Sequence, residues 1–157
     1  MPDAGVDAGG DSGPPAGPAL YVAQAAAGTS DGSSCANAHP VTWFNDPTKW
    51  GAAPTQIGPG TVVHLCGTFT GTAGGTMLTA QGSGTAGSPI TLYFEPGAVL
   101  TAPYWQIAIS LKNQSYLTID GGQNGIIENS ANGLIPLKPL QSSRSAYHPP
   151  GHSALSI

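Results

Sequence analysis

Short runs in which apolar and polar residues alternate follow one another along the chain from Thr61 onward, with turn residues between them. Alternation with a period of two is typical of β-strands, because successive side chains of a strand point to opposite faces. Nine such runs form three sets of three: 61–66, 67–72 and 76–80; 90–95, 98–102 and 107–112; and 116–120, 125–129 and 133–137. The pattern predicts an all-β protein built from short strands.

The three sets also repeat at a nearly constant interval. When the first run of each set is matched by the turn that ends it, at Cys66, Glu95 and Asp120, the intervals are 29 and 25 residues. Periods of about 20 to 50 residues indicate a solenoid. A β-sandwich also has many short strands, but these usually meet in hairpins of about two to five residues. We therefore expect a single-stranded parallel β-helix with about three coils.

This alignment assigns the two faces of the first strand in each coil. Stacked strands place matching residues in columns about one strand spacing apart. The residues expected to point inward are Val63, Leu65, Leu92, Phe94, Leu117 and Ile119. The residues expected to point outward are Val62, His64, Cys66, Thr91, Tyr93, Glu95, Tyr116, Thr118 and Asp120.

The segments on either side of the repeats differ from them in composition. The first residues are rich in Pro, Gly, Ala and Asp and hold too little apolar surface to offset the entropy of ordering. The next segment is apolar but not periodic and contains Trp43, Phe44 and Trp50. Such a segment would cover the core and the strand edge of the first coil. We expect a disordered linker over 1–19, an N-terminal cap over 20–60, coils over 61–137 and an irregular tail over 138–157.

Three segments carry a resemblance to a known family. YVAQAAAGTSDGSSC at 21–35, PGTVVHLCGTFTG at 59–71 and YLTIDGG at 116–122 resemble the N-terminal cap and first coils of right-handed parallel β-helix proteins of the pectate-lyase-like (pectin-lyase-fold) superfamily. The resemblance implies the fold more than an activity, because the same scaffold carries lyases, glycosidases, epimerases and adhesins. Members of that superfamily usually continue for many more coils. We therefore expect the solenoid to be truncated in this chain; the alternative is a short C-terminal cap.

The charge balance limits the class of partner. Four basic residues stand against eight acidic ones, for a net charge of −4. Binding nucleic acid requires clustered Lys or Arg, so we do not expect a nucleic-acid partner. No stretch approaches the roughly 18 apolar residues of a membrane span. An acidic polysaccharide is the partner that the resemblance implies, with calcium bridging its charges where basic residues are scarce.

The two cysteines, Cys35 and Cys66, form an even pair in a chain that we expect to be extracellular or on the cell surface. A disulfide would tie the cap to the end of the first strand; the alternative is two buried free thiols. The first residues contain no export signal of their own.

Glu95 and Asp120 form the first candidate site. If both end the same strand in successive coils, their carboxylates lie ~4.8 Å apart. Two carboxylates at that separation can bind Ca²⁺ or divide the acid and base roles of glycoside cleavage. The alternative is that Asp120 forms the turn before two glycines and that Glu95 is a solvated residue before Pro96.

His64, Tyr93 and Tyr116 form the second candidate site, a sugar-stacking surface on the outward side of the same strands; isolated aromatic residues on a sheet are the alternative. Lys112 is a candidate base for a lyase, against the alternative of a solvated turn lysine. Asn113 is expected to be a corner residue, since Asn tolerates the left-handed conformation.

Two classes of function therefore stay open. The first is the N-terminal part of a secreted or surface carbohydrate-active protein, a polysaccharide lyase or glycoside hydrolase, that lacks the full catalytic set. The second is a non-catalytic surface β-helix that binds glycans, serves in adhesion or acts as a structural spacer.

Overall fold

The computed structural model describes residues 17–123 and 125–131, and their secondary structure is almost entirely β. The strands are β1 (Ala19–Ala23), β2 (His39–Pro40), β3 (Val62–Cys66), β4 (Thr68–Thr70), β5 (Gly75–Thr79), β6 (Ile90–Phe94), β7 (Val99–Ala102), β8 (Trp105–Ser110), β9 (Leu117–Asp120) and β10 (Ile126–Asn129). Helical structure is limited to α1 (Val41–Phe44) and two 3₁₀ turns, η1 (Cys35–Asn37) and η2 (Pro47–Lys49). The expected all-β class is confirmed. The expected strand at 133–137, the tail at 138–157 and nearly all of the expected linker lie outside the described residues.

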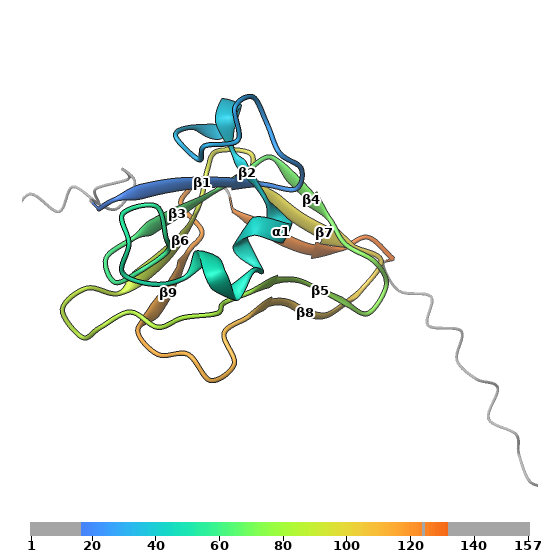
Figure 1. Ribbon diagram of the computed structural model, residues 1–157. Coiled ribbons are helices and arrows are strands. Elements are labelled where there is room, and N and C mark those ends of the chain that lie inside the picture. The colour runs from blue at the N-terminus through green and yellow to red at the C-terminus, as the bar shows by residue number, and fades with distance from the viewer. Residues whose placement is uncertain (1–16, 124, 132–157) are drawn as a thin grey trace, which may run out of the picture.

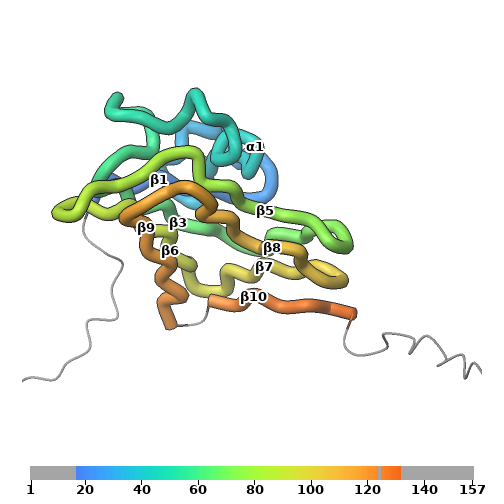
Figure 2. Tube along the Cα trace, turned by 90° about the horizontal axis from the view of Figure 1, so that it is seen from below, coloured from blue at the N-terminus to red at the C-terminus, as the bar shows by residue number. Residues whose placement is uncertain are grey.

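The strands form three sheets, and every pairing between named strands is parallel. The orders are β2-β1-β3-β6-β9, β10-β7-β4 and β5-β8. From β3 onward, successive strands enter different sheets, and each strand pairs with the strand three places later. Figure 1 shows the three sheets around a common interior, and Figure 2 shows α1 and β10 at opposite ends of the stack.

The register agrees with one predicted interval and corrects the other. Val62 pairs with Thr91, which is the expected interval of 29 residues. Thr91 then pairs with Thr118, so the second interval is 27 residues and the predicted 25 is wrong. Turn matching failed for two reasons: Asp120 is the last residue of its strand whereas Glu95 follows the end of β6, and in register β9 ends one residue earlier than β6. An error of two residues in the register does not change which face of the sheet each side chain is on. It does change the neighbours: Asp120 lies beside Tyr93.

The inward columns form the core. Val63, Leu65, Leu92 and Phe94 are buried, as predicted, and β4, β7 and β5 add Phe69, Leu100 and Leu78. The last layer differs. Ile119 and Ile127 pair with the buried Leu92 and Leu100, yet they are 43% and 49% exposed. Among the described residues, the core is therefore open at the β9 and β10 end.

Aromatic residues of the segment before β3 close the other end of the core. Phe44 is fully buried in α1 and meets Trp50 edge to face, with ring centroids 5.0 Å apart. The Trp50 indole Nε1 donates a hydrogen bond to the Phe44 carbonyl oxygen at 2.7 Å. This satisfies the one polar atom of a large buried ring. Trp43, by contrast, stacks on His39 and is only partly buried.

Side-chain amides pair with the free edges of two sheets. The Gln24 Nε2 donates to the Thr70 carbonyl oxygen of β4 at 3.0 Å, and the Thr70 N–H donates back to the Gln24 Oε1. The Asn45 Nδ2 donates to the Met77 carbonyl oxygen of β5 at 2.9 Å, and the Thr79 N–H donates to the Asn45 Oδ1 at 2.8 Å. Each amide thus occupies the place of a neighbouring strand, which reduces the exposed backbone of an edge.

Candidate functional site

Four polar or aromatic residues lie side by side across the five-stranded sheet. Tyr21 of β1 pairs with His64 of β3, His64 with Tyr93 of β6, and Tyr93 with Asp120 of β9. We call these four residues the polar ladder. They alternate along their strands with residues of the core, so the polar ladder lies on the face turned away from it.

His64 is held from three directions. Its Nδ1 lies 2.5 Å from the Glu95 Oε1, its ring stacks on Tyr21 at 4.4 Å, and Tyr93 meets it edge-on at 5.6 Å. An ionised carboxylate only accepts hydrogen bonds, so Nδ1 carries the hydrogen of this bond. A histidine oriented by a carboxylate is the arrangement used in general acid–base catalysis. Here, however, His64 is only 3% exposed and offers no surface to a substrate.

The structure does not form the predicted pair of carboxylates. Glu95 is engaged with His64, whereas the Asp120 Oδ1 accepts a hydrogen bond from the Gly122 N–H at 2.9 Å. Asp120 is therefore the turn-forming residue of the alternative interpretation, and the register separates it from Glu95 by two positions. Within residues 17–123 and 125–131, no group of three or more His, Cys, Asp or Glu side chains could hold a metal ion. Ca²⁺ also takes backbone carbonyl and water oxygens as ligands, so the calcium site expected at Glu95 and Asp120 stays a prediction.

The predicted sugar-stacking surface is not continuous. Tyr93 is 6% exposed, and the turn at Gly122 lies against it, since a Cβ there would stand 3.2 Å from the Tyr93 hydroxyl oxygen. Buried with His64, Tyr93 cannot present a ring face to a sugar. Tyr116, immediately before β9, is the one member of the predicted trio that is exposed.

The connection from β8 to β9 holds the remaining candidates. Lys112 is exposed there, away from the polar ladder, as its alternative interpretation requires. Asn113 has φ 63°, which confirms the prediction of a left-handed corner residue. Tyr116 also has a left-handed backbone, with φ 55°, and nothing in the sequence pattern predicts this.

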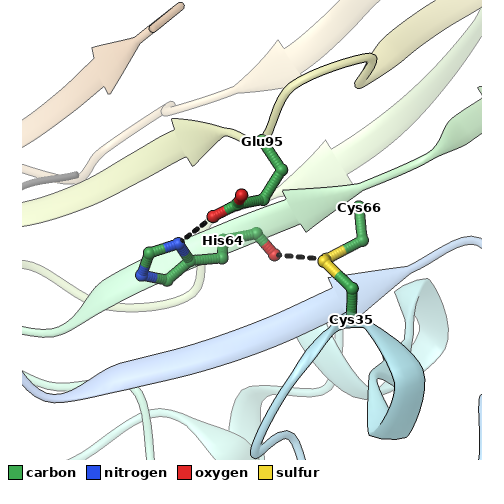
Figure 3. The surroundings of a disulfide bond; sticks show 4 residues. All are labelled: Cys35, His64, Cys66 and Glu95. Atoms are coloured by element: carbon green, nitrogen blue, oxygen red, sulfur yellow. Dashed lines mark hydrogen bonds and ion pairs between the residues drawn. A yellow bond between two sulfur atoms is a disulfide. The ribbon is translucent and has the colours of Figure 1, made fainter. Parts of the chain in front are cut away.

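The predicted disulfide between Cys35 and Cys66 is present. It joins η1 to the last residue of β3 and closes a separation of 31 residues. Figure 3 shows the disulfide beside His64 and Glu95. The Cys66 Sγ lies 3.8 Å from the His64 carbonyl oxygen.

Sequence reasoning missed two partners of His64. Tyr21 is one, although its run ALYVA alternates as VVHLC does and places Tyr21 at the position of His64. Glu95 is the other. It lies diagonally across from His64, one residue past the end of β6, and a column-by-column comparison overlooks diagonal neighbours.

A hollow of about 300 Å³ lies beside the cap, and its lining is mostly Gly, Ala and Pro. Its one amide side chain, Gln56, is hydrogen-bonded to the backbone of Ala53 and Thr48. The lining therefore supplies few side-chain groups that could bind a ligand.

None of the described helices is long and apolar enough to cross a bilayer. No protein-family model, curated protein or solved structure matches the chain. The resemblance to pectate-lyase-like proteins consequently rests on the three sequence segments, and the parallel sheets are compatible with it.

Proposed function

We propose that the chain is the capped N-terminal part of a right-handed parallel β-helix with about three coils, in a secreted or surface protein that acts on or binds acidic polysaccharide. The main support is the topology: each of the first two repeats contributes one strand to each of three sheets, and the third adds β9 and β10 to two of them, always in parallel. The disulfide fits an oxidising compartment outside the cytosol.

The described residues act as cap and scaffold in this proposal. Glu95 contacts His64 and the Asp120 Oδ1 accepts from the Gly122 N–H, so the two carboxylates do not form the pair that glycoside cleavage uses. If the whole protein cleaves a polysaccharide, its catalytic residues lie elsewhere. The exposed ring of Tyr116 favours the second class, a non-catalytic β-helix that binds glycans, because an exposed aromatic ring can pack against a sugar.

The test measures binding and turnover together. Isothermal titration of the full chain with polygalacturonate oligosaccharides, with and without millimolar Ca²⁺, is compared with a neutral glucan. Chromatography of long incubations detects cleavage. Binding of the acidic glycan without cleavage supports the proposal. Absence of binding under both conditions overturns the polysaccharide assignment, and cleavage overturns the statement that catalysis lies elsewhere.

A further inference from the structure

Two tyrosines are largely exposed, and their backbones differ. Tyr104 is 57% and Tyr116 is 56% exposed. Tyr116 has φ 55°, whereas Tyr104 is not among the residues with positive φ. A left-handed conformation brings the Cβ of an L-residue close to the following carbonyl oxygen and is therefore strained. Asn113, at φ 63° in the same connection, is of a type that tolerates this conformation, whereas Tyr is not.

The surrounding turn holds Tyr116 in that conformation. Its carbonyl oxygen accepts a hydrogen bond from the Ile90 N–H at 3.0 Å. The preceding Ser115 accepts at its carbonyl oxygen from the Gly84 N–H, and its own N–H donates to the Ser83 Oγ, both at 3.0 Å. A Cβ at Gly84 would stand 2.5 Å from the Tyr116 carbonyl oxygen, so the two connections fit closely only with glycine there.

Burial of the Tyr116 side chain does not offset the strain of its backbone. A ring that is more than half exposed recovers only part of the free energy that burial of a tyrosine provides. Glycine or asparagine would fit the same backbone with less strain. Strained residues held by a rigid surrounding are found at ligand contacts, where the strain serves the presentation of a side chain.

From this combination we infer that Tyr116 is a stacking platform for a pyranose ring of an acidic glycan. The ring face would pack against the apolar C–H face of the sugar. The exposed Lys112, in the same connection, supplies a positive charge for a uronate carboxylate. This inference rests on the proposed function and names the part of the chain that would make the contact.

The test compares Tyr116→Ala, Tyr116→Phe and the matched control Tyr104→Ala, with polygalacturonate oligosaccharides as the probe in isothermal titration. We expect Tyr116→Ala to weaken binding about tenfold or more, while Tyr116→Phe and Tyr104→Ala stay within about twofold of the wild type. Thermal unfolding followed by circular dichroism checks that each variant is folded. Tyr116→Gly adds an independent readout: it should keep or raise the unfolding midpoint while binding falls.

The outcomes separate the two proposals. If the wild type binds no acidic glycan, the proposed function and this inference both fail. If the wild type binds and Tyr116→Ala binds equally well, this inference alone is overturned. An equal loss in Tyr104→Ala also overturns it, because the effect would then not be specific to the strained tyrosine.

Discussion

His64 shows how a single buried ring depends on its neighbours. Its Nδ1–H has one acceptor, the Glu95 carboxylate; Tyr21 stacks on its ring and Tyr93 meets the ring edge-on. A buried donor left without an acceptor costs about 1–3 kcal/mol. Glu95, although partly exposed, therefore contributes to stability through the residue that it satisfies.

We predict that Glu95→Ala lowers the free energy of unfolding by about 1–3 kcal/mol, because the Nδ1–H of His64 loses its acceptor. Glu95→Gln keeps an oxygen acceptor and should lose less. Urea unfolding measures both. The control is Glu128→Ala, which removes the same charge from an exposed position and should stay within about 0.5 kcal/mol of the wild type. Equal losses in Glu95→Ala and Glu128→Ala would contradict the prediction.

His39 gives a prediction about pH. Partial burial, with its ring stacked on Trp43 at 3.9 Å, lowers the pKa of His39 below its ordinary 6.5. The unfolded chain then takes up this proton at a higher pH than the folded chain, so the contribution of His39 to stability falls as the pH drops below about 6.5.

An NMR titration of the His39 ring should give a midpoint below 6.5 in the folded protein. In His39→Gln, the unfolding midpoint should fall less between pH 7 and pH 5 than in the wild type. A folded-state titration midpoint above 6.5 for His39 would show that the proposed effect of burial is wrong.

Sequence reasoning succeeded for residues with strong local preferences. Asn113 was predicted to be left-handed because its residue type tolerates that conformation, and the two cysteines were predicted to pair. The contact between His64 and Glu95 was not predictable in the same way. It depends on a diagonal between β3 and the residue after β6, and the comparison of columns considers only residues directly opposite one another.

At the scale of strands, alternation was a reliable guide. Each strand from β3 to β10 overlaps one of the predicted runs. The amides of Gln24 and Asn45 were not predicted, because one amide side chain leaves no periodic signal in the sequence. They nevertheless hydrogen-bond to the backbone along one edge of β4 and one edge of β5.

We predict that Asn45→Asp destabilises the protein by about 1–2 kcal/mol, because the Met77 carbonyl oxygen loses its donor and faces a carboxylate instead. The Thr79 N–H keeps its acceptor, so the strand should remain paired on that side. Urea unfolding at pH 7 measures the loss. Gln106→Glu makes the same amide-to-carboxylate change at an exposed position of β8 and should cost little. A loss in Asn45→Asp no larger than in Gln106→Glu would contradict this role of the amide.

At the scale of the whole molecule, the disulfide joins the segment before the repeats to the first sheet. Closing a loop of 31 residues stabilises by roughly 3–4 kcal/mol in the loop-entropy account. We predict that reduction raises amide hydrogen exchange around η1 and β2 before it does so in β6 and β7. Exchange measured by mass spectrometry with and without reductant checks this. Simultaneous loss of protection in all four elements would show that the disulfide supports the entire fold.

The two ends of the stack lead to different modes of self-association. At the first end, β1, β2 and the amides of Gln24 and Asn45 occupy the positions that a foreign strand would need. At the last end, β9 and β10 have no further strand beside them among residues 17–123 and 125–131, next to Ile119 and Ile127. As far as the described residues determine it, strand pairing between two copies would therefore use this same end of each copy. Such a contact closes on itself, so crowding should produce pairs and not growing fibres.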